Sequence, residues 1–233
     1  MKAYSSKHLG FPDPRLAGAD GLLAAGGNLE SHTLLEAYCS GIFPWFNEDQ
    51  PILWWSPDPR TVIFPEDIHI SRSLRRFIRQ TKLTLSCDQD FEGVLEGCAQ
   101  SRAQQSEPGT WITGEMKSAY KRLFENQHAH SIEVWQENQL VGGLYGVSIG
   151  KVFFGESMFS AIGNASKLVL VSVCKQLSEA GFELIDCQVS SPHLLSMGAR
   201  ELARDDYLCR LEQAAEIPTD QTAWLTWPNR LNL

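Results

Sequence analysis

The sequence predicts an α+β fold: a small irregular N-terminal subdomain, then a larger domain with a central mixed, mostly antiparallel sheet flanked by helices. Three strand-like segments follow one another between residues 131 and 158, and the tight links at Glu137-Asn138 and Gly150 predict an antiparallel meander. A helical segment and an apolar strand, Glu183 to Val189, come next, which makes the sheet mixed. The sequence before Thr61 lacks such periodicity.

Residues 1–62 are predicted to form the small N-terminal domain. A short helix from Ser31 to Ser40 is expected to end at Gly41, because glycine favours the left-handed conformation that follows a helix. Tryptophan then concentrates in a proline-punctuated stretch, at Trp45, Trp54 and Trp55. These rings are either the core of a domain with few aliphatic residues or flat platforms for nucleobases, and the sequence leaves both open.

Residues 63–233 are predicted to form the larger domain, with strands and helices alternating from Thr61 onward. The strand signals run from Thr61 to Phe64, Leu83 to Ser86, Ser131 to Gln136, Gln139 to Ile149, Lys151 to Met158 and Glu183 to Val189. The helix signals run from Ser71 to Gln80, Phe91 to Arg102, Glu115 to Gln127, Asn164 to Ala180, His193 to Met197 and Asp205 to Ala215. Thr113 is expected to cap the third of these helices, and Gly181 to end the fourth.

The composition is that of an ordinary globular protein, with 43% hydrophobic and 21% charged residues in a chain of 233. The apolar runs fall far short of the roughly 20 residues that a membrane helix needs. Met1 to His8 has no apolar stretch like that of a secretory signal. We therefore expect a cytoplasmic protein with no membrane span, and a monomer, since there are no coiled-coil heptads.

Metal binding is not expected from the cysteines and histidines. The six cysteines are scattered without a Cys-x-x-Cys pair, which favours reduced, packed thiols over a disulfide or zinc framework. His128 and His130 lie at strand spacing, but no third ligand is near them in the sequence.

One strongly basic segment occurs in a chain whose net charge is −8. Its arginines recur at helical spacing and share one face of the expected helix: Arg72, Arg75, Arg76 and Arg79. An acidic protein with one basic face can bind a polyanion there and repel it elsewhere. The spacing alone leaves open a plain solvated helix surface.

Two carboxylates and an amide stand in otherwise apolar, strand-like sequence, at Glu156, Asp186 and Gln188. A buried ionised group is costly unless it is paired, hydrogen-bonded or used, so these residues are candidates for an active site. Strand alternation puts Asp186 and Gln188 on one face of their strand, and it likewise aligns Phe154, Glu156 and Met158. If the two strands are neighbours, Glu156 and Asp186 share one pocket.

Two nearby carboxylates in apolar surroundings suit an amine substrate, which they attract, orient and relieve of a proton. The alternative is that Glu156 or Asp186 is a satisfied buried acid, paired with Lys167 or an arginine. Ser157 lacks the Gly-x-Ser-x-Gly turn of a serine nucleophile, so covalent serine chemistry is not expected.

Segments in order along the chain, over about residues 11 to 210, resemble the signature blocks of the leucyl/phenylalanyl-tRNA-protein transferase family. They are Phe43–Phe46, Trp54–Arg60, His69–Ser73, Gly109–Thr113, His130–Trp135, Gly155–Ser160, Asn164–Lys167 and Asp186–Gln188. This resemblance implies a larger domain like the N-acetyltransferase fold, with neither a metal nor a diffusible cofactor. It also implies transfer of leucine or phenylalanine, and less efficiently methionine, from leucyl-tRNA or phenylalanyl-tRNA to proteins with an N-terminal Arg or Lys. Such transfer marks a protein for degradation by the N-end rule pathway.

The resemblance further implies roles for individual residues. Asp186 with Gln188 would orient or deprotonate the incoming α-amine, and Glu156 would help to hold the basic N-terminal residue. The residues near the terminal adenosine of the tRNA would be Trp45 and Trp111, as its platform, with Tyr38 and Tyr120 close by. The residues lining the apolar pocket for the transferred side chain would be Leu144, Phe153, Met158 and Ile185. The residues facing the tRNA acceptor stem would be Arg72, Arg75, Arg76 and Arg79.

One position departs from the family pattern: Ser191 stands where an asparagine is usual. A serine hydroxyl cannot reproduce the paired donor and acceptor of an amide, so the role of this position is open.

Two other functions would use some of these residues. An acyl-CoA-dependent N-acyltransferase would cradle a pyrophosphate with a glycine-rich turn, but the turn from Ser160 to Asn164 has a single glycine. A non-catalytic RNA-binding module would use the basic face and the aromatic rings, but it leaves Glu156 and Asp186 unexplained.

Overall fold

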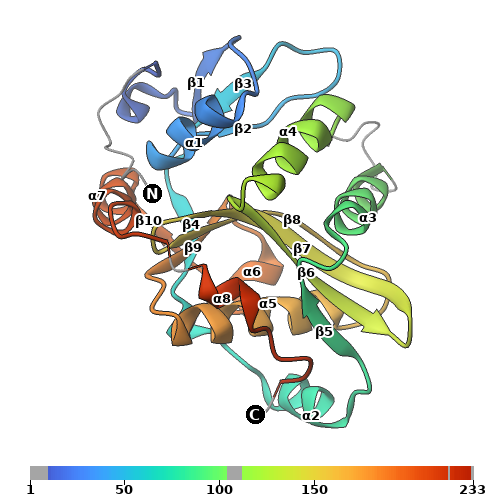
Figure 1. Cartoon of the computed structure of the whole chain (residues 1–233). Helices are drawn as coiled ribbons and strands as arrows, with labels where there is room; N and C mark the ends of the chain where they lie inside the picture. Colours follow the sequence, from blue (N-terminus) through green and yellow to red (C-terminus); the bar gives the residue numbers. More distant parts are fainter. Residues whose placement is uncertain (1–9, 104–111, 220, 232–233) are drawn as a thin grey trace.

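A seven-stranded sheet forms the centre of the larger part of the molecule, in a computed structural model that describes residues 10–103, 112–219 and 221–231 (Figure 1). Its strands, in spatial order, are β10 (Arg200–Leu202), β4 (Arg60–Ile63), β9 (Leu184–Gln188), β8 (Val152–Ser160), β7 (Gln139–Ile149), β6 (Ala129–Gln136) and β5 (Thr84–Cys87). Neighbouring strands are antiparallel except β8 and β9, which are parallel. The predicted mixed, mostly antiparallel sheet is confirmed.

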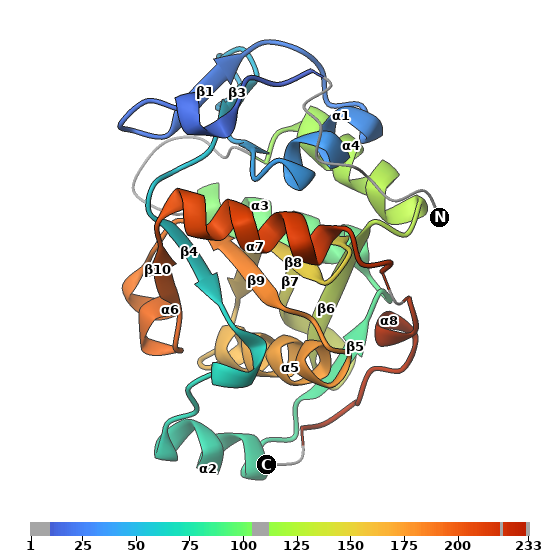
Figure 2. The ribbon, with the colours of Figure 1, turned by 90° about the vertical axis from the view of Figure 1, so that its left-hand side faces the viewer.

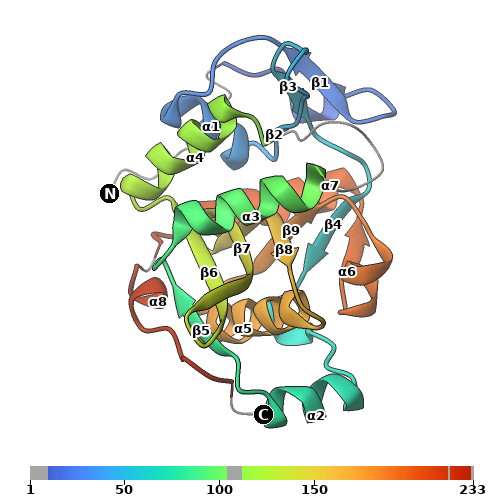
Figure 3. The same ribbon diagram turned by 90° about the vertical axis from the view of Figure 1, so that its right-hand side faces the viewer.

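Helices cover both faces of this sheet (Figure 3). They are α1 (Ser31–Cys39), α2 (Arg72–Gln80), α3 (Phe91–Ala103), α4 (Gly114–Glu125), α5 (Ala165–Glu179), α6 (Pro192–Ser196), α7 (Arg204–Ala215) and α8 (Thr222–Leu225), with 3-10 turns η1 (Pro14–Leu16) and η2 (Pro65–Asp67). One core cluster joins α5 to Phe153 and Ile185, and the other joins α1, α3, α4 and α7 to Phe154 and Leu184. Because neighbouring residues of a strand face opposite sides, β8 and β9 contribute to both cores.

The predicted helix ends are formed by the residues named for them. The Thr113 hydroxyl accepts a hydrogen bond from the backbone N–H of Met116 at 3.3 Å and so caps α4. Gly41 and Gly181 follow α1 and α5 with φ of 73° and 70°, the left-handed region in which glycine is unstrained. Within the described ranges, no helix combines the length and the apolar composition that a membrane span requires.

The N-terminal part contains a small antiparallel sheet that the sequence did not predict. Its strands are β1 (Leu22–Ala25), β3 (Leu53–Trp55) and β2 (Phe43–Pro44), and this sheet lies at the opposite end of the molecule from α2 (Figure 2). Strands of two to four residues, with an irregular register between Leu22 and Ala24, are too short to show a period. Strand β4 belongs to the large sheet and spans residue 62, where the predicted domain division falls.

The pairing of β8 with β9 stops early. The register holds for three pairs, of which the last is Phe154 with Asp186, although β8 continues to Ser160. A β-bulge in the β7–β8 pairing inserts Glu156 between Gly155 and Ser157. The expected alignment of Met158 with Phe154 and Glu156 is therefore wrong: beyond the bulge, Met158 packs into the core on the α5 side, whereas Phe154 packs on the other.

Candidate active site

Asp186, on β9, is fully buried and fully hydrogen-bonded. Arg60 on β4 makes a bidentate ion pair with it: Nε lies 2.9 Å from Oδ1, and Nη2 lies 2.7 Å from Oδ2. The hydroxyl of Tyr207 on α7 donates to Oδ2 at 2.7 Å, and the backbone N–H of Gln188 donates to Oδ1 at 2.9 Å. Each carboxylate oxygen therefore accepts two hydrogen bonds. Asp186 has an arginine partner, which is one of the alternatives that the sequence left open.

Arg60 is the buried cation of this site, with 1% of its surface exposed. Its Nη1 donates to the carbonyl oxygen of Gly41 at 3.1 Å, and its guanidinium lies 4.8 Å and 4.7 Å from the ring centres of Phe43 and Tyr207. Burial is the largest single influence and opposes the positive charge, but the attraction of Asp186, Tyr207 and Glu156 together with the hydrogen bonds to Asp186 outweighs it, so the pKa of Arg60 is raised. The charged pair joins β4, β9 and the turn after α1.

Glu156 is the second buried carboxylate, and it has no cationic partner among the hydrogen bonds and ion pairs of the described residues. The Tyr120 hydroxyl donates to Oε2 at 2.5 Å, and the Gln188 amide Nε2 donates to Oε1 at 2.8 Å. Burial raises the pKa of Glu156 to about 7, and the negative charge of Asp186 adds to this, while the hydrogen bonds that Glu156 accepts oppose it. Near neutral pH, Glu156 is therefore poised between its two protonation states.

Gln188 connects the two carboxylates. Its backbone N–H binds Asp186 and its side-chain amide binds Glu156. Its φ of 64° lies in the left-handed region, which costs free energy in a residue with a side chain and clusters at functional sites. The structure thus brings Glu156, Asp186 and Gln188 together across the place where β8 and β9 stop pairing.

A family model described as "Leucyl/phenylalanyl-tRNA protein transferase" matches residues 62–212, which include β4, β8, β9 and α7, and a model of the N-terminal domain of that transferase matches residues 27–58. The chain belongs to the leucyl/phenylalanyl-tRNA protein transferase family. It is therefore a transferase enzyme.

Curated members of the leucyl/phenylalanyl-tRNA protein transferase family match almost the whole chain. The transferase of Desulfatibacillum aliphaticivorans is 49% identical over 225 residues, covering 96% of each chain. That of Shewanella baltica is 51% identical over 218 residues, and that of an Anaeromyxobacter strain is 52% identical over 214 residues. These alignments cover 93% and 92% of this chain, respectively, and 91% of each relative.

Solved structures of other proteins show a more distant likeness. A GCN5-related N-acetyltransferase from Kribbella flavida has a TM-score of 0.42 at 11% identity, covering 74% of this chain and 60% of its own. A structure titled L-PGS from Bacillus licheniformis has a TM-score of 0.43 at 9% identity, covering 80% of this chain and 71% of its own.

The aromatic residues that the family resemblance assigned to adenosine differ in exposure. Trp45 is 44% exposed, and its ring centre lies 5.8 Å from that of Trp55, so it can offer a ring face to a base. Tyr38 and Tyr120 are fully buried, and their hydroxyl groups meet at 2.7 Å. Trp111 lies outside the described residues.

The four residues assigned to the apolar pocket lie together in the core on the α5 side. Leu144 pairs with Met158 across β7 and β8, and Phe153 pairs with Ile185 across β8 and β9. Glu156 bonds instead to Tyr120, which belongs to the core on the opposite face. The candidate site therefore includes both faces of the sheet beside the end of the β8–β9 pairing.

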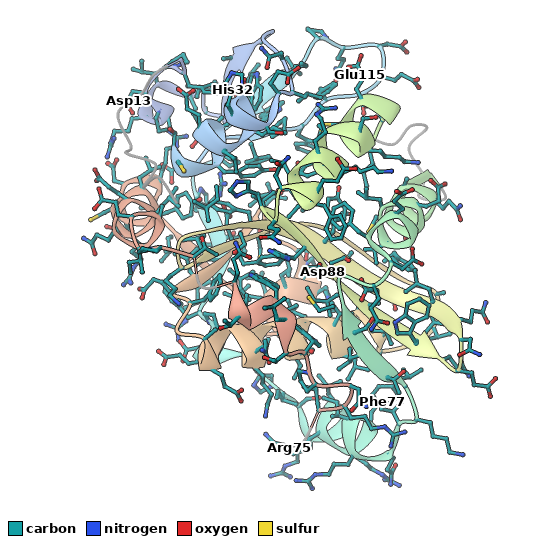
Figure 4. All side chains as sticks on the ribbon, viewed as in Figure 1. Asp13, His32, Arg75, Phe77, Asp88 and Glu115 are labelled. Atoms are coloured by element: carbon teal, nitrogen blue, oxygen red, sulfur yellow. The ribbon has the colours of Figure 1, made fainter. Side chains whose placement is uncertain are left out.

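The basic face lies on α2, away from the carboxylates. Leu74 and Ile78 are buried against the body, and the outward residues are the exposed Arg72, Arg75, Arg76 and Arg79. Figure 4 shows Arg75 at the outer end of the molecule. Arg230 of the C-terminal segment lines, together with Arg79, a cavity of about 280 Å³ beside α2. The single-face spacing predicted from the sequence is confirmed.

Two site residues were not singled out from the sequence: Arg60 and Tyr207. Arg60 ends a quoted signature block, but nothing in that block shows that it pairs with a residue 126 positions later. The hydroxyl of Ser191 accepts the backbone N–H of Leu194 at 3.2 Å and caps α6, which is a task that asparagine performs equally well. Among the described residues, no group of three or more His, Cys, Asp or Glu gathers where it could hold a metal ion.

Proposed function

We propose that this protein transfers leucine or phenylalanine, and less efficiently methionine, from aminoacyl-tRNA to the α-amine of proteins that begin with Arg or Lys. It acts in the cytoplasm as a monomer, without a metal or diffusible cofactor, and it marks those proteins for N-end rule degradation. The observation that carries this proposal is the unequal pair of buried carboxylates, with Asp186 neutralised by Arg60 and Glu156 free of a bonded cation among the described residues.

The chemistry needs little more than positioning and the handling of one proton. The amine nitrogen attacks the ester carbonyl, the new C–N bond forms, and the bond from that carbon to the ribose oxygen breaks. The amine loses a proton, and the departing ribose oxygen gains one. The aminoacyl ester is already reactive, so no covalent enzyme intermediate is required.

The two carboxylates take different parts in this reaction. Asp186 positions Gln188 and is a poor proton acceptor, because four donors already occupy its oxygens. Glu156, with its pKa raised by burial to about 7, attracts the basic N-terminal residue and accepts a proton from the amine. Gln188, which already bonds to Glu156, orients the amine beside it.

The remaining contacts follow from the same reaction. The transferred side chain packs among Leu144, Phe153, Met158 and Ile185, where a flexible methionine suits both aliphatic and aromatic groups. The terminal adenosine stacks on Trp45, with Trp111 as its second platform. The acceptor stem lies against α2, where the basic face offsets an overall charge of −8.

A transfer assay tests this function. Labelled leucyl-tRNA, phenylalanyl-tRNA and acetyl-CoA are each offered with peptides beginning with Arg, Lys or Ala. We expect label from both charged tRNAs on the Arg and Lys peptides alone. An absence of transfer from charged tRNA to the Arg peptide would overturn the proposal, and transfer from acetyl-CoA would replace it with an acyl-CoA-dependent reaction.

A further inference from the structure

A chain of hydrogen bonds reaches Glu156 from the N-terminal part of the molecule. Tyr38 lies on α1 and Tyr120 on α4, and both side chains are fully buried. Their hydroxyl oxygens are 2.7 Å apart, and the Tyr120 hydroxyl lies 2.5 Å from Oε2 of Glu156. Tyrosines buried this deeply offer no ring face to a nucleobase, so their conformation needs another explanation.

The direction of these hydrogen bonds follows from chemistry. An ionised carboxylate can only accept, so Tyr120 must donate its proton to Glu156. The oxygen of Tyr120 is then the acceptor for the hydroxyl proton of Tyr38. Burial raises the pKa of both phenols well above 10, so each keeps its proton and remains a donor. Donors aligned in one direction polarise each other and strengthen the final bond to the carboxylate.

The packing around the chain holds it in one arrangement. The Tyr38 ring lies 5.0 Å from that of Phe154, and the Tyr120 ring lies 5.3 Å from that of Tyr145. Oε2 of Glu156 is directed to the tyrosines, while Oε1 faces Gln188, where the β8–β9 pairing has ended. The rotation of the carboxylate is thereby set by Tyr120 on one side and by Gln188, at the end of β9, on the other.

We propose that Tyr120, supported by Tyr38, is a positioning residue that fixes the carboxylate of Glu156 and favours its ionised form beside Gln188. This inference rests on the proposed function for its catalytic meaning, and it concerns residues that act through Glu156 rather than on the substrate. It replaces the adenosine contacts that the family resemblance suggested for these two tyrosines.

The test is the pH dependence of transfer by Tyr120→Phe, which keeps the ring and removes the hydroxyl. Glu156 then loses one of the two donors to its ionised form and keeps only Gln188, so the acidic limb of the kcat profile should move up by about one pH unit. Near pH 7, kcat should fall about tenfold, while the KM for aminoacyl-tRNA stays within about twofold. Tyr38→Phe, one hydrogen bond further away, should move the limb in the same direction by less.

Other titratable and charged groups face Glu156, and a matched variant separates their effects. They are Asp186 on β9 and Arg60 on β4, while Tyr145 on β7 lies beside Tyr120. Tyr207→Phe also removes one fully buried phenol hydroxyl, but that hydroxyl bonds to Asp186. It should leave the acidic limb in place, whatever it does to the rate.

A second measurement does not depend on the reaction. The infrared band of a protonated carboxyl group, assigned to Glu156 by its loss in Glu156→Gln, should persist to higher pH in Tyr120→Phe than in the natural protein. An unchanged band and an unchanged limb would overturn the inference. If Tyr120→Phe does not fold, Tyr38→Phe serves for both measurements. Failure of the natural protein to transfer leucine would count against the proposed function, and the infrared result would still judge the tyrosines.

Discussion

Two buried carboxylates, Glu156 and Asp186, lie on adjacent strands and differ in the partners that compensate their burial. The bidentate guanidinium of Arg60 compensates Asp186, whereas Glu156 receives hydrogen bonds from neutral groups. A hydrogen bond from a phenol or amide returns less of the lost hydration than an opposite charge does. Asp186 is therefore compensated by an opposite charge, whereas burial raises the pKa of Glu156 to about 7.

The ion pair should be costly to break. Asp186→Asn leaves the Arg60 charge buried without compensation, so we expect a loss of about 3–5 kcal/mol in the free energy of unfolding, measured by urea denaturation. The control is Asp205→Asn, which breaks the exposed pair with Arg15 and should cost no more than about 1 kcal/mol. Equal losses in the two variants would contradict the structural role of Asp186.

The pKa of Glu156 should also appear in the pH dependence of stability. Because burial raises its folded pKa from 4.5 to about 7, the folded state holds the proton more tightly than the unfolded chain. The tighter proton binding stabilises the folded state below about pH 4.5, and this stabilisation is lost as the pH rises toward 7. The free energy of unfolding of Glu156→Gln, taken relative to that of the natural protein, should therefore rise by about 2 kcal/mol as the pH increases from 5 to 8. The measurement is the free energy of unfolding of both proteins from urea titrations at each pH. If the two curves run parallel across this pH range, Glu156 does not titrate as described.

Helix α2 packs on the body through one face and carries exposed arginines on the other. Ser71 caps it by accepting the backbone N–H of Leu74 at 3.2 Å, and buried Leu74 and Ile78 attach it to the body. Arg75 and Arg76 are exposed and lie outside this attachment face, so their charge can change while the core packing is kept. A helix of nine residues would be marginal alone, and its packing makes it a stable carrier of charge.

Charge reversal on α2 should weaken tRNA binding. In the double variant Arg75→Glu and Arg76→Glu, the slope of log K against log salt should fall by about one for each phosphate group that the helix no longer neutralises. Titration of charged tRNA at several salt concentrations measures this. Arg210→Glu, an exposed change on α7, is the control and should keep the slope. An unchanged slope in the double variant would remove α2 from the tRNA surface.

Across the whole molecule, the small N-terminal part and the large sheet are joined at the candidate active site. Arg60 bonds to Gly41 after α1 as well as to Asp186, and Tyr38 of α1 reaches Glu156 through Tyr120. One core cluster also contains residues of both parts, including Leu34, Trp54 and Tyr207. The two parts are therefore expected to share their stability.

We expect a single unfolding transition for the chain. Circular dichroism is dominated by the helices of the larger part, while Trp45, Trp54 and Trp55 contribute tryptophan fluorescence from the smaller one. The midpoints from the two probes in urea should coincide. Because the larger part holds the other four of the seven tryptophans, an earlier fluorescence component that accounts for only part of the signal would mean that the N-terminal part unfolds by itself.

How far the sequence predicts this structure depends on how local each feature is. Helices α1, α2, α4 and α5 and the β6–β7–β8 meander could be predicted, because their caps, turns and periodicities lie within their own segments. The bulge at Glu156 could not, since it depends on register against β7, and it reversed the expected face of Met158.

The sequence predicts which residues belong to the candidate site better than it predicts which of them bond to one another. Glu156, Asp186 and Gln188 attract notice as polar groups in apolar strands. The pairing with Arg60 and the chain through Tyr38 join residues 126 and 82 positions apart, and only the folded chain brings these together. The roles of all these residues in transfer remain predictions.

The β8–β9 ladder ends early, and from that point a side chain bonds the two strands where a backbone amide would otherwise do so. Beyond Phe154 and Asp186, the two strands have no further register pair, and the side-chain amide of Gln188 takes up the role of a cross-strand donor toward Glu156. A side chain can swing aside, whereas a backbone amide cannot leave its ladder. Under the proposed function, the arriving amine brings N–H donors of the same kind, so we expect it to replace Gln188 at Oε1 without leaving the carboxylate oxygen unbonded. The position would then be closed by a hydrogen bond that the proposed substrate is able to exchange.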